Sequence, residues 1–247
     1  MRAPRLFVEA GLATGAAIEL KDETLHYARN VLRLDVGAPL LLFNGEGPQF
    51  EATVTAAGKR SLTLAVGADT GAARDTALPV HLGIGLARGE RMDWVVQKCT
   101  ELGVASITPL LLARCNAKFD QDRGDNRLRH WRQVAISACE QCGRNRLPLI
   151  EEPMPLERWL AMRTGAPGLV LHTAESNPLA RGDAPAQLRL LVGPEGGLED
   201  NEFAQARAAG FTPWSLGPAE RMKVRVHGQH AAIPDFDFIE QHLAALP

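Results

Sequence analysis

Strand-like and helix-like patterns alternate through the chain from Pro79 onward, and this alternation constrains the fold more than any other feature. The apolar, strand-like runs are Val80–Ala87, Ile107–Leu112, Leu169–Thr173 and Leu188–Val192, and helical spacing spans Arg91–Leu102, Asp125–Cys142 and Leu198–Ala209. Gly103 and Gly143 stand where glycine ends a helix. Such an alternation is typical of βαβ units, whose parallel strands are buried on both faces. The sequence therefore predicts an α/β domain.

Residues 1–75 have a different pattern, with short strands and one helix. The expected strands are Arg5–Ala10, Pro39–Asn44, Phe50–Ala56 and Ser61–Val66, and the expected helix runs from Asp22 to Arg33 with Leu25, Ala28, Val31 and Leu32 as its apolar stripe. Gly67–Leu78 is rich in Gly, Ala, Thr and Asp, which is typical of a linker. We therefore expect a small β-barrel domain over residues 1–75 and an α/β domain over residues 76–247.

Composition and charge exclude some functions and favour others. The sequence has no apolar run of the ~18–20 residues that span a membrane, and Met1-Arg2-Ala3-Pro4 leads into no apolar signal core, so we expect a cytoplasmic protein without a membrane partner. The net charge is −2, yet residues 114–146 hold eight Lys or Arg against four Asp or Glu, a local net charge of +4. Such a segment fits either an RNA-binding face or an ordinary solvated helix.

The four cysteines do not predict a metal site. Cys139 and Cys142 form a C-x-x-C, but zinc sites need a second pair at related spacing, and Cys99 with Cys115 does not supply one. We expect helix-face cysteines and no bound metal.

The segment Leu190–Leu198 is an apolar strand that ends in a glycine-rich turn and leads into a helix. Ligands of open α/β sheets bind beyond the carboxyl ends of strands, and glycine lets the backbone approach a ligand closely. A phosphate loop would carry Lys-Ser/Thr rather than Glu195, so a ligand with positive charge fits better. A tight turn without any ligand is the alternative.

A second glycine pattern, Gly83–Arg88, also follows a strand. It is similar to a dinucleotide-binding turn, but Arg88 occupies the position of the third glycine, where a small residue is needed. A nicotinamide enzyme is therefore a remote alternative.

Four blocks of sequence resemble one family, the 16S rRNA uridine N3-methyltransferases of the SPOUT superfamily of knotted methyltransferases. The blocks are His26–Arg33 with Gly37, Arg88–Trp94 running into Gln97–Val104, Arg129–Trp131 leading to Glu140–Arg144, and Gly193–Gly197 followed by Ser215–Pro218. They occur in the family's order over roughly residues 5 to 218, and four blocks in order are far more specific than one.

The resemblance implies a fold, a cofactor and partners. It implies a PUA-like β-barrel followed by a SPOUT-type α/β domain with a C-terminal trefoil knot, a homodimer, and 16S rRNA of the small ribosomal subunit as the substrate. It also implies that S-adenosylmethionine binds to loops that correspond here to Leu171, His172, Thr173, Gly193, Pro194, Glu195, Gly196, Gly197, Leu216, Gly217 and Pro218.

Methyl transfer to a ring nitrogen that carries a proton needs two positioned reactants and one general base. Glu195 is a candidate for that base or for contact with the sulfonium, and a purely structural carboxylate is the alternative. The candidates for RNA contact are Arg5, Arg29, Arg33, Arg88, Arg91, Lys98, Arg114 and Arg144. Trp94 and Trp131 lie on apolar helix faces, and we expect them to pack in the core.

The family pattern breaks after Pro218. The family continues with an arginine-containing segment and an alanine-rich helix, whereas this chain has Ala219–Gly228 and then Pro234. Arg221 is our candidate for the missing catalytic arginine. The break also motivates an alternative function, an RNA-binding or ribosome-assembly protein with impaired catalysis.

Overall fold

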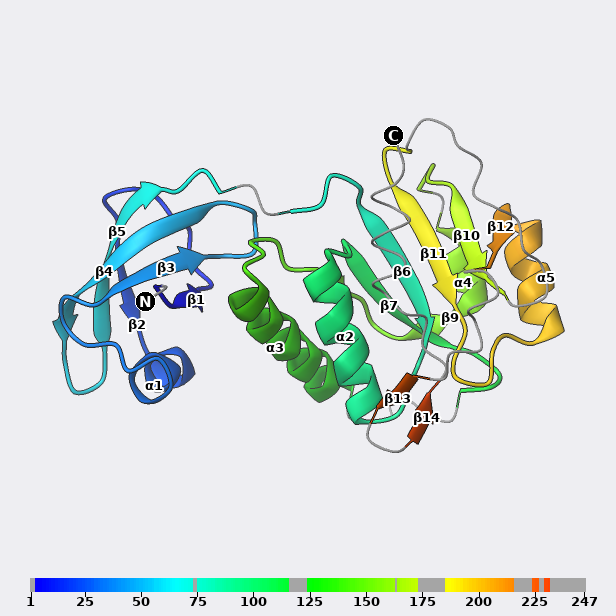
Figure 1. Cartoon of the computed structure of the whole chain (residues 1–247), viewed down its shortest axis with the longest axis horizontal. Coiled ribbons are helices and arrows are strands. Elements are labelled where there is room, and N and C mark those ends of the chain that lie inside the picture. Colours follow the sequence, from blue (N-terminus) through cyan, green and yellow to red (C-terminus); the bar gives the residue numbers. More distant parts are fainter. Residues whose placement is uncertain are drawn as a thin grey trace. The chain divides into compact units, whose positions relative to one another are not determined.

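The computed structural model describes residues 3–72, 75–115, 124–162, 164–172, 185–215, 224–226 and 229–231 (Figure 1). The chain forms two compact units. The first comprises Met1–Asp75 together with Gln133–Leu147, and the second comprises Thr76–Arg132 and Pro148–Pro247.

A five-stranded sheet and one helix form most of the first unit. The elements are β1 (Arg5–Phe7), β2 (Ala17–Leu20), α1 (Asp22–Asn30), β3 (Pro39–Phe43), β4 (Gln49–Ala57) and β5 (Leu62–Asp69). The strand order is β1-β3-β4-β5-β2, with β1 parallel to β3 and the other neighbours antiparallel. One apolar cluster fills the inner face of the sheet, and Leu25 and Ala28 of α1 pack into it.

The four strands expected in this unit are present, and three details of the expectation were wrong. The sequence missed β2, whose four residues alternate between exposed and buried positions. The helix ends at Asn30, and Val31 is 60% exposed rather than part of the apolar stripe. Arg33 has a positive φ of 54°, which a continuing helix does not allow. The linker was also expected to begin at Gly67, which is too early, because β5 continues to Asp69.

A segment from the middle of the chain belongs to the first unit. Ile136 and Cys139 of helix α3 (Gly124–Cys142) form an apolar cluster with Phe7 and Phe43, and Leu147 packs against it. The backbone N–H of Phe7 donates to Glu140 Oε1 at 3.0 Å. These contacts were not foreseen from the sequence, and the domain bounds 1–75 and 76–247 stay a prediction.

The second unit contains the parallel sheet. Its further elements are β6 (Val80–Gly85), α2 (Glu90–Leu102), β7 (Ser106–Leu111), β8 (Leu149–Ile150), β9 (Met154–Pro155), α4 (Leu156–Ala161), β10 (Gly168–Leu171), β11 (Leu188–Val192), α5 (Asp200–Ala208) and β12 (Phe211–Trp214). The strand order is β12-β10-β11-β6-β7-β8, β9 also pairs with β7, and every pairing is parallel. The α/β prediction is confirmed.

The parallel sheet brings distant segments together. Figure 1 shows β6 beside β11, although the two strands are far apart in the sequence. Trp159 of α4 and Ala206 of α5 share one apolar cluster with Val170 and Leu191 of the sheet. Helix α2 buries Met92, Val95, Val96 and Cys99. No helix among the described residues is long and apolar enough to span a membrane.

The helix ends show which sequence signals hold. Gly103 ends α2 in the left-handed conformation, with φ of 85°, and the N–H of Gly143 bonds to the carbonyl of Cys139 at the end of α3. Glu199 caps α5 in a reciprocal capping box with Glu202. Strand β12 was missed. Strand β13 (Val224–Val226) pairs with β14 (Gln229–Ala231).

Candidate functional site

The candidate cofactor site lies at the carboxyl edge of the parallel sheet. Strand β6 has β7 on one side and β11, then β10, on the other. In open α/β sheets, ligands bind where the strand order reverses in this way. The segments that meet at this edge follow β6, β7, β10 and β11, and the glycine turn Gly193–Gly197 is one of them.

The turn is shaped by glycines that leave no room for a side chain. A Cβ on Gly85 would lie 2.5 Å from the backbone nitrogen of Pro194, and a Cβ on Gly193 would lie 2.9 Å from backbone atoms of Gly197 and Leu198. Gly197 has φ of 73°, and its N–H donates to the carbonyl of Pro194 at 2.8 Å. The chain therefore needs glycine here for backbone packing.

Glu195 is held by an arginine from α2. Arg91 Nη1 lies 2.8 Å from Glu195 Oε1, and the side chains are 40% and 24% exposed. Among the described residues, the interactions of Glu195 leave its Oε2 without a partner. The sequence placed Arg91 among the RNA contacts, and the structure instead brings it to the glycine turn.

The segment after β7 also forms hydrogen bonds to this turn and to the helix that follows it. Arg114 Nη1 donates to the carbonyl of Gly196 at 2.9 Å. The N–H of the neighbouring Ala113 donates to Glu202 Oε1 at 2.8 Å, and Glu202 Oε2 accepts the N–H of Glu199 at 2.8 Å. Arg114, a second candidate for RNA contact, therefore also lies at the turn.

His172 follows β10 at the same edge of the sheet. Its ring stacks on Phe203 of α5 with a centroid distance of 4.0 Å. Its backbone N–H donates to the carbonyl of Trp214 at 3.0 Å. Leu171, the last residue of β10, is half-buried beside it. The remaining predicted site residues, Thr173, Leu216, Gly217, Pro218 and Arg221, lie outside the described residues.

Cys115 also lies near this edge, and it is half-buried. Burial raises the pKa of its thiol, with smaller contributions from Glu202 and Glu195, so it is not a reactive thiolate. Among the described residues, no group of three or more His, Cys, Asp or Glu could hold a metal ion.

The other predicted RNA contacts of the second unit are partly accessible. Arg88 is exposed just before α2. Lys98 forms an ion pair with Glu101 at 2.8 Å on the surface of α2. Trp131 is buried, as expected of a core residue, whereas Trp94 is only half-buried.

In the first unit, Arg5 and Arg29 bond to the protein itself. Arg5 is 6% exposed, its guanidinium lies 4.6 Å from the centre of the Phe43 ring, and it donates to the side chain of Gln49. A group buried in this way cannot reach a phosphate, so we withdraw Arg5 as an RNA contact. Arg29 donates to the carbonyls of Gly58 and Ser61, which ties α1 to the β4–β5 turn. Arg33 is exposed.

The loop after α3 holds a residue that the sequence analysis missed. Arg144, a predicted RNA contact, has an 11% exposed side chain and lies 3.6 Å from Asp75. Arg146 has a 64% exposed side chain. Both arginines stand in one Gly-Arg-Asn-Arg sequence, so no sequence signal tells the exposed one from the covered one.

Comparisons with known proteins define the class. A family model of an RNA methyltransferase domain matches residues 74–223, and a model of the RNA methyltransferase PUA domain matches residues 20–66. The first match covers more than half of the chain, so the second unit carries an RNA methyltransferase domain. The PUA assignment of the first unit is confirmed as well.

Relatives and solved structures narrow the class to one family. "Ribosomal RNA small subunit methyltransferase E" of Synechocystis is 34% identical over 222 residues, which cover 86% of this chain and 71% of that protein. The protein of the same name from Buchnera aphidicola subsp. Acyrthosiphon pisum is 29% identical over 217 residues, which cover 87% of this chain and 86% of that protein. The chain belongs to the ribosomal RNA small subunit methyltransferase E family, as its four sequence blocks had indicated.

Two similar structures were solved with a ligand. The family member from Neisseria gonorrhoeae, bound to S-adenosyl methionine, is 28% identical with a TM-score of 0.85 and covers 98% of both chains. A methyltransferase from Legionella pneumophila in complex with bound SAM is 35% identical with a TM-score of 0.83, over 88% of this chain and 90% of its own.

Proposed function

We propose that the protein transfers a methyl group from S-adenosylmethionine to N3 of a uridine in the 16S rRNA of the small ribosomal subunit. One observation carries the proposal: the glycine turn Gly193–Gly197 lies at the carboxyl edge of a parallel sheet in a chain of this family. The proposed place of action is the cytoplasm, where ribosomal subunits are made and modified.

The residues at the turn fit the cofactor. A Cβ on Gly197 would meet no heavy atom within 4 Å, so one side of this backbone is open to a ligand. The proposed contacts are Leu171, His172, Thr173, Gly193 to Gly197, Leu216, Gly217 and Pro218. When bound, the cofactor supplies an electrophilic methyl group on a sulfonium.

The chain's own residues position the reactants and remove the N3 proton. We assign Glu195 to the catalytic group, because Arg91 holds Oε1 of Glu195 and leaves Oε2 as a proton acceptor. Arg221 is assigned to the same group on the family resemblance alone. Glu195→Gln keeps an oxygen for Arg91 and removes the base. If Glu195 is the base, this variant loses methyl transfer and keeps its cofactor affinity. If Glu195 only anchors the turn through Arg91, this variant keeps most of its methyl transfer, because the amide oxygen of Gln preserves the contact.

A trefoil knot and a homodimer are further parts of the proposal, and both are supported by the family resemblance. Light scattering at a protein concentration on the order of tens of micromolar should give twice the mass of one chain, because a dimer interface of standard size stays formed at that concentration. A monomer at that concentration would contradict the dimer.

A second candidate function is an RNA-binding protein with impaired catalysis. The observation that favours it is the β13–β14 pair, which stands where the family pattern predicts an alanine-rich helix, and the match to the family model ends at residue 223. Calorimetric titration with S-adenosylmethionine separates the two, because the impaired protein should bind it weakly.

The proposed function is tested in cells. Mass spectrometry of small-subunit rRNA, with and without the gene, should show one N3-methyluridine that is lost on deletion and restored by the wild-type gene. An unchanged set of methyluridines would contradict the proposal.

A further inference from the structure

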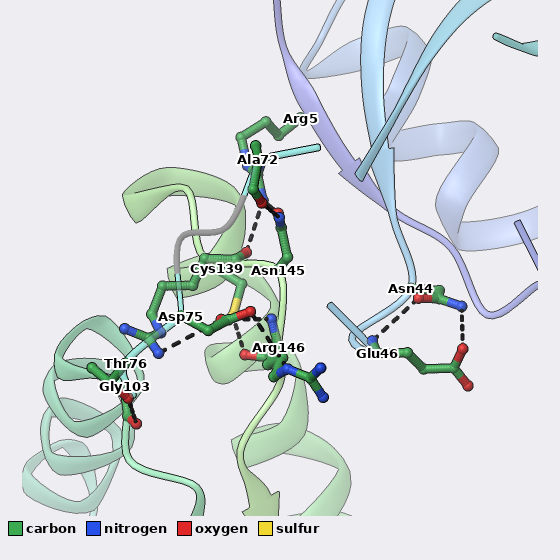
Figure 2. Close-up of polar contacts among 11 residues, drawn as sticks. Arg5, Asn44, Glu46, Ala72, Asp75, Thr76, Gly103, Cys139, Asn145 and Arg146 are labelled. Carbon is green, nitrogen blue, oxygen red and sulfur yellow. Dashed lines mark hydrogen bonds and ion pairs between the residues drawn. The ribbon is translucent and has the colours of Figure 1, made fainter. Parts of the chain in front are cut away.

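The loop between α3 and β8 is fixed in place within the first unit. Arg5 Nη2 donates to the carbonyl of Arg144 at 2.7 Å and to Asn145 Oδ1 at 2.9 Å. Asn145 is fully buried, and its Nδ2 donates to the carbonyl of Ala72 at 3.0 Å (Figure 2). The N–H of Leu147 donates to the carbonyl of Gly45 at 3.2 Å. The two arginines of this loop therefore start from a rigid backbone.

Both arginines converge on the carboxylate of Asp75. Arg144 Nη2 lies 3.6 Å from Oδ1, and Arg146 Nε lies 3.5 Å from Oδ2. The backbone N–H of Arg146 also donates to Oδ1, at 3.3 Å. Figure 2 shows Asp75 beside Arg146, in the same view as Asn44 and Glu46. One carboxylate thus receives three donors, each at a longer distance than the ~2.7–2.9 Å of a tight charged hydrogen bond.

The carboxylate of Asp75 is shared between two guanidinium groups, and Arg146 keeps most of its side chain in solvent. The Arg146 guanidinium lies along Gly47, where a Cβ would approach Nη2 to 2.9 Å. A glycine at this position therefore leaves space for the arginine.

Two guanidiniums and one backbone N–H around a pair of oxygens form a geometry that suits a phosphate group. Guanidinium binds phosphate through parallel hydrogen bonds, and Arg is favoured over Lys at such positions for this reason. A carboxylate presents two oxygens to these donors, as a phosphodiester does. An arginine on a fixed backbone also loses less freedom on binding.

We infer that Arg146, with Arg144 beside it, forms a phosphodiester-binding site for RNA, and that the carboxylate of Asp75 occupies this site until RNA displaces it. The inference rests on the proposed function, since the phosphodiester is that of the RNA substrate. Asp75 then lowers the affinity of the first unit for RNA in general, so that correct contacts elsewhere are needed to complete binding.

The first test removes the competing carboxylate. Asp75→Asn keeps an oxygen for the N–H of Arg146 and removes the charge. With a labelled single-stranded fragment of unmethylated 16S rRNA, we expect its affinity to rise about threefold, the size of a weak surface charge interaction. Glu46→Gln is the matched control, because Glu46 is an exposed acid nearby whose carboxylate bonds to Asn44. It should change the affinity much less.

The second test removes the proposed phosphate contact. Arg146→Gln should lower the RNA affinity about threefold and make the salt dependence shallower, by roughly 0.7 in slope for one contact on a single strand. Arg60→Gln, on the exposed turn between β4 and β5, is the control arginine. In the double variant Asp75→Asn/Arg146→Gln, the gain in RNA affinity caused by Asp75→Asn should be smaller than in the single variant.

The results separate the inference from the proposed function. Equal RNA affinity and salt slope for wild type, Asp75→Asn and Arg146→Gln, all folded and all binding S-adenosylmethionine, would make the cluster a structural ion pair and overturn the inference. If wild type binds no rRNA, the proposed function fails and the inference fails with it. If Asp75→Asn gains affinity but no methyl is transferred, the site stands and only the catalytic part of the function fails.

Discussion

Two regions of this molecule place arginines against a carboxylate, and they differ in how the charges are shared. At the glycine turn of the second unit, Arg91 meets Glu195 at 2.8 Å. In the first unit, Arg144 and Arg146 share Asp75 at 3.6 and 3.5 Å. At the glycine turn a short ion pair holds Glu195, whereas in the first unit two arginines share one acid at longer distances. The distance to the acid and the sharing of that acid, not the residue type, distinguish the proposed positioning arginine from the proposed RNA-binding one.

The largest effect is expected at the glycine turn itself. Gly193→Val would force a side chain against the backbone of Gly197 and Leu198, so cofactor affinity should fall by roughly tenfold to a hundredfold. Gly196→Ala is the matched variant, because its Cβ would meet only the Arg114 side chain, at 3.3 Å. Calorimetry should show a much smaller loss for it. Equal affinity in a folded Gly193→Val protein would remove the turn from the site.

The next effect concerns stability in the first unit. Arg5→Ala removes a buried guanidinium that bonds to Gln49, the Arg144 carbonyl and Asn145, so unfolding should become easier by about 2–4 kcal/mol. Arg146→Ala, from the exposed end of the same cluster, should change the stability by less than about 0.5 kcal/mol. Denaturant unfolding measures both. Equal losses would contradict the contrast between a buried structural arginine and an exposed one.

A smaller effect is expected at Arg91, and it sharpens the comparison most directly. Arg91→Ala should lower cofactor affinity about threefold to tenfold, because it releases Glu195, and should leave the salt slope of RNA binding unchanged. Lys98→Ala, on the same helix and at a predicted RNA contact, should show the opposite pattern, with a shallower salt slope and unchanged cofactor affinity. A shallower salt slope with unchanged cofactor affinity would return Arg91 to the RNA contacts, where the sequence had placed it.

The smallest effect is a pH dependence at Glu140. Burial raises the pKa of this carboxyl, against the hydrogen bonds from the Phe7 N–H and the Tyr27 hydroxyl. A raised folded-state pKa means that Glu140 supports folding fully only below its unfolded pKa, near 4.3, and loses this contribution as the pH rises through the folded value.

Glu140→Gln should therefore melt like wild type near pH 4 and on the order of 2–4 °C higher at pH 7. The exposed Glu46→Gln serves as the control. A gain of equal size at both pH values would mean that charge burial is not the cause.

Much of the fold could be predicted from the sequence. The alternation after Pro79 identified the parallel sheet, and Leu188–Val192 matches β11 residue for residue. The predictable elements have strong local signals, such as Gly103 after α2. Strands β2 and β12 were missed, and both are held by pairing with strands far along the chain, β5 and β10. The inclusion of Gln133–Leu147 in the first unit is likewise decided by tertiary contacts with Phe7 and Phe43.

The site was predictable in its backbone and less so in its side chains. The Gly193–Gly197 turn carries its signal in the sequence, because only glycine fits where a Cβ would meet backbone. The roles of arginines do not carry such a signal. Arg5 is buried, Arg91 and Arg114 contact the turn, and Arg146 was overlooked. Each outcome depends on which acid or carbonyl the fold brings within reach, and spacing along the chain does not encode that.

The most direct test of the central claim follows the methyl group itself. Purified protein would be incubated with small ribosomal subunits from cells that lack the gene and with S-adenosylmethionine carrying a deuterated methyl group. We predict one labelled N3-methyluridine in 16S rRNA by mass spectrometry, at the position lost on deletion, and much less label with Gly193→Val at a limiting cofactor concentration. No transfer by a protein that binds both the cofactor and the RNA, or a label on another atom or another RNA, would contradict the account.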